Sequence, residues 1–222
     1  MKKSFILLIV VAFILQSCAK IFYTPDAARL AAAHKIIAIA PPKVAIAPRK
    51  NIPGDALIEQ QKTESVNFQK EMYSWMLKRK MQGAINVEVQ DVETTNAILA
   101  KTGFNYAKVL TPKEMCNVLG VDGMITSNYS LVRPMSEGVA IAVALLGAWG
   151  PTHNVTVSLS IHDQSTNKII WNFDHELSSS FLGSPAGLVG ALMRQASRKM
   201  PYFTSSRAMT LERWMIPALE TQ

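Results

Sequence analysis

Ionisable side chains that could bind a metal ion or transfer a proton gather at one place in the sequence, on two neighbouring segments. His162 and Asp163 end the first segment, and Asp174, His175 and Glu176 lie in the second. Because the two segments are predicted to pair as a hairpin, the five side chains would form a polar patch that binds a metal ion or a partner. The alternative is a solvated sheet face, on which charged side chains meet only water.

The other histidines give no support for a metal centre. His34, His153, His162 and His175 fall in different predicted elements and lack the spacing of metal ligands. The sequence has no Gly-x-Ser-x-Gly elbow, no phosphate-cradling loop and no His-Glu-x-x-His motif. We therefore expect no metal, no cofactor and no enzymatic activity, and an envelope hydrolase is disfavoured.

The sequence contains 2 cysteines, Cys18 and Cys116. Cys116 lies in 111–120, which reads as a short amphipathic helix, and no histidine stands near it in the sequence. A thiol without a base or an electropositive setting is usually a small buried hydrophobe. We expect that role for Cys116, which would have no disulfide partner if Cys18 carries lipid.

Cys18 directly follows a segment that reads as an export signal. Lys2 and Lys3 precede an uninterrupted apolar run over 5–15, which is too short for a transmembrane helix and is typical of a secretory leader. Ser17 and Cys18 resemble the lipobox of bacterial lipoproteins, in which the chain is cut before the cysteine and the thiol is diacylated with fatty acids such as palmitate. The alternatives are a plain secretory leader and an uncleaved membrane anchor.

Lipid at Cys18 would hold the mature protein at a membrane surface, because two acyl chains anchor a protein stably. Ala19 is not the Asp that retains lipoproteins at the inner membrane in enterobacteria, so we expect an outer-membrane lipoprotein that faces the periplasm. Without residues 1–17 the chain has 205 residues, and its formal net charge falls from +7 to +5 with the loss of Lys2 and Lys3. An exported chain without a recognition motif is not expected to bind nucleic acid.

The mature chain reads as one α/β domain over 35–202, between a lipid-anchored tether over 18–34 and a C-terminal tail over 203–222. Alternating apolar residues predict strands, and apolar residues at three- and four-residue spacing predict helices. The strands are expected at 35–40, 44–47, 86–91, 122–130, 155–162 and 169–173, and the longer helices at 56–82, 94–101, 111–120 and 184–200. This order predicts a mixed sheet of about five strands with flanking helices, in a two-layer or three-layer sandwich.

An apolar segment stands where a polar connection between two strands is expected. It covers 138–150 and is rich in Ala, Gly and large aliphatic residues. One interpretation is that it packs as core on its own sheet. The other is a surface for self-association or for contact with lipid, because an apolar run in a connection marks an interaction site. The residues that would make this contact are Ile141, Val143, Leu145, Leu146 and Trp149.

Three pieces of the sequence together resemble a known group of proteins. They are the opening strand with its double proline over 37–42, the strand entry Leu-Gly-Val-Asp-Gly over 119–123, and the hairpin formed by 160–163 and 168–171. This arrangement is similar to the periplasmic lipoproteins related to CsgG, LpoB and the TolB N-terminal domain, and it covers roughly 35–200. The resemblance implies a fold like that of the TolB N-terminal or anticodon-binding domain, and a domain that works by binding.

The sequence thus favours a non-enzymatic, lipid-anchored protein of the cell envelope that acts as a binding or assembly factor. Its expected partner is another envelope protein or a second copy of this chain. The alternative is a subunit of an oligomeric outer-membrane export channel of the CsgG type. The channel type is less favoured because the sequence lacks two amphipathic hairpins whose strands have the 9–11 residues of a barrel strand.

Overall fold

The computed structural model describes residues 20–47, 53–104, 110–132, 153–179 and 185–203. Its strands are β1 (Lys20–Tyr23), β2 (Ile36–Ile39), β3 (Lys43–Ile46), β4 (Glu88–Val89), β5 (Gly123–Val132), β6 (His153–Asp163) and β7 (Lys168–Ser179). Its helices are α2 (Ala27–Ala33), α3 (Gly54–Met81), α4 (Val92–Lys101), α5 (Pro112–Leu119), α7 (Pro185–Ala196) and the short 3-10 helix η1 (Ser197–Lys199). These elements confirm the predicted α/β class.

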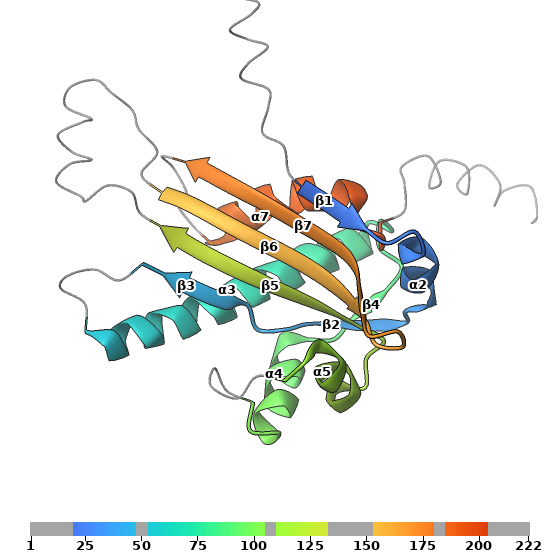
Figure 1. The fold of residues 1–222 in the computed structure, drawn as a ribbon, viewed down its shortest axis with the longest axis horizontal. Coiled ribbons are helices and arrows are strands. Elements are labelled where there is room, and N and C mark those ends of the chain that lie inside the picture. Colours follow the sequence, from blue (N-terminus) through green and yellow to red (C-terminus); the bar gives the residue numbers. More distant parts are fainter. Residues whose placement is uncertain (1–19, 48–52, 105–109, 133–152, 180–184, 204–222) are drawn as a thin grey trace, which may run out of the picture.

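The strands form one mixed sheet in the order β1-β7-β6-β5-β2-β4, with β3 paired to β5 beyond the end of β2 (Figure 1). β5, β6 and β7 form an antiparallel meander, and β1 pairs antiparallel with β7. β2 and β3 run parallel to β5, and β4 runs parallel to β2. The sheet has seven strands where about five were expected: β1 is an edge strand that was not predicted, and the strand predicted at 86–91 is reduced to the two-residue β4.

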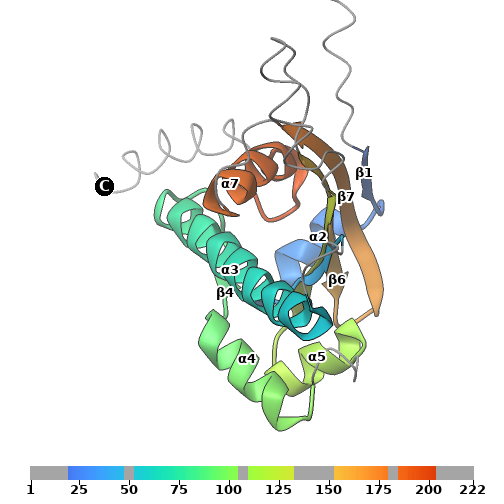
Figure 2. The same cartoon turned by 90° about the vertical axis from the view of Figure 1, so that its left-hand side faces the viewer.

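Among the described residues, helices cover both faces of the sheet at the β2 edge and one face at the β7 edge (Figure 2). Figure 2 shows α3 and α7 against one face, with α4 and α5 gathered at one end of the sheet. Along β2, Ile37 and Ile39 join the core that includes α3 and α7, whereas Ala38 joins a second core with Leu99 of α4 and Cys116 of α5. Both predicted layer arrangements are therefore present, three layers around β2 and two layers around β6 and β7.

Two buried polar side chains of α3 hold the break between β2 and β3. Pro41 and Pro42 interrupt the strand, as predicted, because proline cannot donate to a ladder. Ser65 donates from Oγ to the carbonyl oxygen of Pro42 at 2.7 Å, and Gln69 donates from Nε2 to the carbonyl oxygen of Ile39 at 2.7 Å. The break thus leaves neither carbonyl unpaired in the core.

Within the predicted tether over 18–34, the helical character expected from the Ala-rich stretch 27–33 is confirmed by α2, whereas the strand at 20–23 was not predicted. Lys20–Tyr23 form β1, which pairs with β7 from Asp174 to Trp171. In α2 the side chains of Ala27, Leu30 and Ala31 are buried in the main core. β1 leaves too weak a signal in the sequence to be predicted, because it has only four residues and only Ile21 among them is partly buried.

α5 follows its sequence signals closely. Thr111 and Glu114 form the predicted capping box: the Thr111 hydroxyl accepts from the Glu114 amide, and a Glu114 carboxylate oxygen accepts from the Thr111 amide at 2.8 Å. Gly120 ends the helix in the left-handed conformation, at φ 67°. In the part of the chain that the structure describes, no helix combines the length and the apolar character needed to cross a membrane.

Candidate functional site

The five residues of the predicted polar patch do not lie on one surface. His162, Asp174 and Glu176 are half-buried or exposed on the face of β6 and β7 that α3 and α7 leave uncovered, and Asp174 accepts from Asn172 Nδ2 at 2.8 Å. His175 is 4% exposed on the opposite face, with its ring 5.7 Å from that of Phe173. Asp163 is 3% exposed. The alternation of a strand separates His175 from its neighbours, so a single five-residue site is excluded.

Asp163 instead belongs to a buried network that the sequence did not reveal. Its Oδ1 lies 2.8 Å from Nε2 of His34, and Nδ1 of His34 lies 2.7 Å from the hydroxyl of Tyr202. Asp163 Oδ2 accepts hydrogen bonds from the Thr166 amide and from the hydroxyls of Ser165 and Thr166. The network therefore connects the segment before β2, the β6–β7 turn and the segment after η1.

The hydrogen bonds of this network set the ionisation of Asp163. Burial alone raises the pKa of the carboxyl, but the hydrogen bonds from Thr166, His34 and Ser165 outweigh it and lower the pKa to about 2. Gly123 leaves room for the ring, since a Cβ at this position would lie 2.7 Å from two atoms of His34. A His–Asp pair with both side chains 3% exposed is closed to substrate, so we assign it a structural role.

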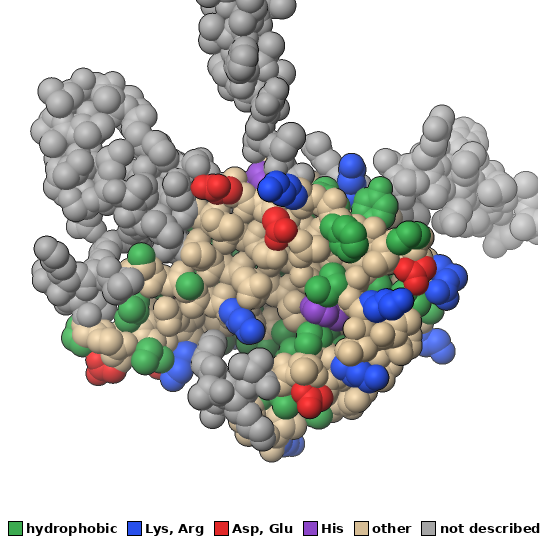
Figure 3. All heavy atoms as spheres, viewed as in Figure 1, with side chains coloured by type: hydrophobic (Ala, Val, Ile, Leu, Met, Phe, Trp, Pro, Cys, Tyr) green, Lys and Arg blue, Asp and Glu red, His purple; other side chains and the backbone are tan. Residues whose placement is uncertain are grey.

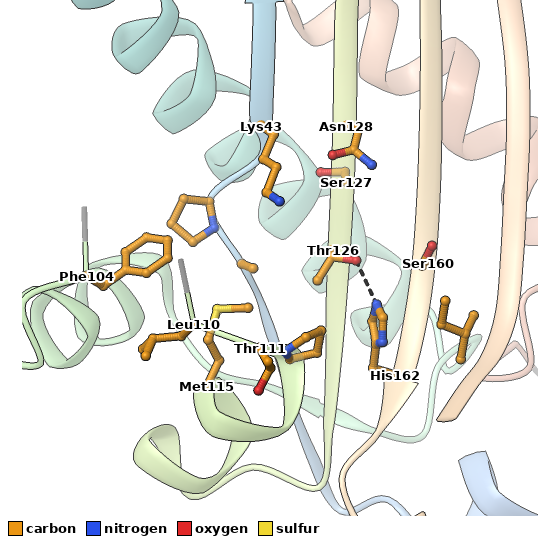
Figure 4. Close-up of a pocket in the computed structure, with 14 residues that line it drawn as sticks. Lys43, Phe104, Leu110, Thr111, Met115, Thr126, Ser127, Asn128, Ser160 and His162 are labelled. Atoms are coloured by element: carbon orange, nitrogen blue, oxygen red, sulfur yellow. Dashed lines mark hydrogen bonds between the residues drawn. The ribbon is translucent and has the colours of Figure 1, made fainter. Parts of the chain in front are cut away.

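A cleft of about 670 Å³ lies on the uncovered side of the sheet, between β5 and the start of α5. Figure 4 shows Phe104, Leu110 and Met115 on one side of it and side chains of β5 and β6 on the other. Its apolar lining also includes Pro41, Pro112 and Ile169, and its polar lining includes Lys43, Thr111, Thr126, Asn128, Ser160 and His162. A cleft with apolar walls and a few polar groups is suited to binding an amphipathic group.

Among the described residues that line the cleft, His162 is the only one from the predicted patch. Its Nε2 lies 3.0 Å from the Thr126 hydroxyl, and burial lowers the pKa of its ring, so the imidazole is neutral at pH 7 (Figure 4). A hydroxyl beside a neutral imidazole has the arrangement of a nucleophile and its general base. Such a pair also needs a third group that orients the imidazole ring. Among the described residues no carboxylate contacts His162, because Asp163 points to His34.

Beyond α5, the uncovered side of the sheet forms a broad polar surface, here called the open face. Figure 3 shows that most of it carries neither charged nor hydrophobic side chains. Its residues alternate with the buried residues of β5, β6 and β7, and they are Asn128, Thr156, Ser158, Ser160, Asn172, Asp174 and Glu176. The alternation of apolar and polar residues along 155–162 correctly predicted this solvent-exposed face.

The remaining site predictions concern the two cysteines and the apolar segment. Cys18 and the apolar contact residues Ile141, Val143, Leu145, Leu146 and Trp149 lie outside the described residues. Cys116 is 1% exposed, in agreement with its expected role as a small hydrophobe. Burial, with a smaller contribution from Asp163 and Asp122, raises the pKa of this thiol to about 12. The described residues hold no group of three or more histidine, cysteine or acidic side chains that could bind a metal ion.

No protein-family model and no curated protein matches this chain. Among solved structures, the chain is similar to lipoprotein GNA1162 from Neisseria meningitidis, at 12% identity over 74% of this chain and 95% of the other, with a TM-score of 0.43. It is similar to a PelC dodecamer subunit from Paraburkholderia phytofirmans, at 7% identity over 84% and 99%, with a TM-score of 0.40.

The chain is also similar to the LpoB C-terminal domain from Escherichia coli, at 9% identity over 70% of this chain and 94% of the other, with a TM-score of 0.34. The solved structures to which the chain is similar thus include one described as a lipoprotein and an LpoB domain.

Proposed function

We propose that this protein is a lipid-anchored protein of the cell envelope that binds a protein partner, and that it acts as a binding or assembly factor, not as an enzyme. The observation that carries the proposal is the open face with its cleft, exposed on a domain whose chain begins with a lipobox-like leader. The leader supports an outer-membrane lipoprotein that faces the periplasm, with acyl chains on Cys18.

The chemistry of the open face supports recognition of a protein surface. Hydroxyl and amide side chains such as Thr156, Ser158 and Asn128 supply donors and acceptors across several strands, and the adjoining cleft offers apolar walls formed by Phe104 and Leu110. A polar rim beside an apolar pocket is the usual composition of an interface between proteins that also exist apart.

A photo-crosslinking experiment in the native envelope tests the proposal. A photo-reactive amino acid would replace Asn128 or Thr156 on the open face, and Ile58 on the exposed side of α3 as the matched control. We expect one adduct of defined mass from the two open-face positions and none from Ile58. Adducts of equal yield from all three positions, or none from the open face, would contradict the proposal.

A second candidate, a subunit of an oligomeric export channel, is favoured by one observation. The apolar segment 138–150 belongs to the connection between Val132, the last residue of β5, and His153, the first residue of β6, and β1 begins on the side of the sheet that faces this end of the two strands. Lipid and the apolar segment would then meet the same membrane. Size-exclusion chromatography of the delipidated protein separates the two functions, since a channel subunit would elute as a large ring and a binding factor would not.

A further inference from the structure

The edge strand β1 exposes an unusual set of side chains for so short an element. Phe22 and Tyr23 are each 58% exposed, and Lys20 is exposed beside them. Phe22 pairs with Asn172, which faces the open side, whereas Tyr23 pairs with the buried Trp171. The two rings therefore leave the strand toward opposite faces of the sheet, and both remain in contact with solvent.

Exposed rings on both faces of the sheet favour a binding surface that contacts the β1 edge itself, not one of the two faces. A protein docked flat on the open face would cover Phe22 and leave Tyr23 in water. A surface in contact with the β1 edge would cover both rings at once. Figure 3 shows hydrophobic side chains gathered over β1 and the adjoining end of β7.

The position of β1 in the chain, close to Cys18, indicates that this surface is the membrane. Cys18 lies two residues before Lys20, and two residues span at most about 7 Å. β1 itself is fixed to the sheet by its pairing with β7 and by the bond from the Thr24 amide to the Ile170 carbonyl at 3.0 Å (Figure 1). Acyl chains on Cys18 would thus hold the start of β1 at the level of the lipid headgroups.

We propose that Lys20, Phe22 and Tyr23 form a membrane-seating edge, through which the domain rests on the bilayer in a fixed orientation. Aromatic rings settle at the membrane–water interface, and a lysine ammonium is attracted to anionic headgroups. The sheet then stands with its β1 edge on the membrane and its open face directed sideways. This inference rests on the proposed lipid anchor at Cys18.

An environment-sensitive dye on the lipidated full-length protein tests the seating edge. Single cysteines would replace Phe22 or Tyr23, and Ile58 of α3 (53% exposed) and Val118 of α5 (41% exposed) as matched controls. A thiol-reactive dye would label only the new cysteine, because Cys18 is acylated and Cys116 is buried. The proteins would be bound to vesicles of phosphatidylethanolamine and phosphatidylglycerol.

We expect dye fluorescence at positions 22 and 23 to rise about twofold or more on vesicle binding, as the dye leaves water, and to stay unchanged at positions 58 and 118. If the protein binds the vesicles but dye fluorescence stays unchanged at all four positions, the proposed seating edge is refuted, whereas the lipid anchor is not. Protein that carries no acyl chains and does not float with the vesicles would overturn both proposals.

Discussion

Replacing Asp163 with asparagine removes a negative charge from the buried network and keeps the shape of the side chain. The oxygen of the new amide can accept the bonds from Ser165 and Thr166, and its nitrogen can donate to His34 if that ring changes tautomer. The variant is therefore expected to fold. What it loses is the group whose ionisation differs between the folded and the unfolded chain.

The sign and the size of the effect follow from the pKa of Asp163. Folding lowers this pKa from 3.8 to about 2, so the ionised carboxylate stabilises the folded protein above about pH 4. That stabilisation is lost as the pH falls from about 5 toward 2. The depressed pKa corresponds to about 2 kcal/mol of unfolding free energy.

Urea unfolding of a soluble form that begins at residue 19, measured between pH 6 and pH 2, checks this value. The difference in unfolding free energy between the wild type and Asp163→Asn is expected to shrink by about 2 kcal/mol over that range. Asp174→Asn serves as the control on the same hairpin, since Asp174 is half-buried and accepts one bond from Asn172. A difference that stays constant with pH would refute the role assigned to Asp163.

Three further experiments test the packing of the domain. Gln69→Leu leaves the Ile39 carbonyl without its donor in the core, and urea unfolding should show a loss of about 1–3 kcal/mol. Gly123→Ala forces a Cβ into the His34 ring and should lower the melting temperature, whereas Gly54→Ala, with nothing within 4 Å of its Cβ, should not. At pH 8 the Cys116 thiol, with its pKa raised to about 12, should react with a disulfide reagent only after urea is added, and rapid labelling of the folded protein would contradict its burial.

The sequence predicted those elements whose signals are local. The alternation along β6 indicated its buried and wet faces, and Thr111, Pro112 and Gly120 marked both ends of α5. These signals depend on neighbouring residues, so the rest of the fold does not alter them. The strand break at Pro41 and Pro42 was visible for the same reason.

The candidate site was harder to predict because its contacts connect distant parts of the chain. The bond between His34 and Asp163 joins residues 129 positions apart, and nothing in the residues around His34 indicates it. The predicted patch failed at Asp163 because this residue follows the buried Ile161 by two positions in β6, so the alternation of the strand places it on the buried side. β1 was missed because its pairing with β7 spans most of the chain.

Mass spectrometry of the amino-terminal peptide, from protein purified out of its native membrane, tests the proposed lipid anchor most directly. We expect the peptide to begin at Cys18 and to carry a diacylglyceryl group on the thiol. A peptide that begins elsewhere, or a Cys18 without acyl chains, would contradict the lipid anchor and with it the function proposed for this protein.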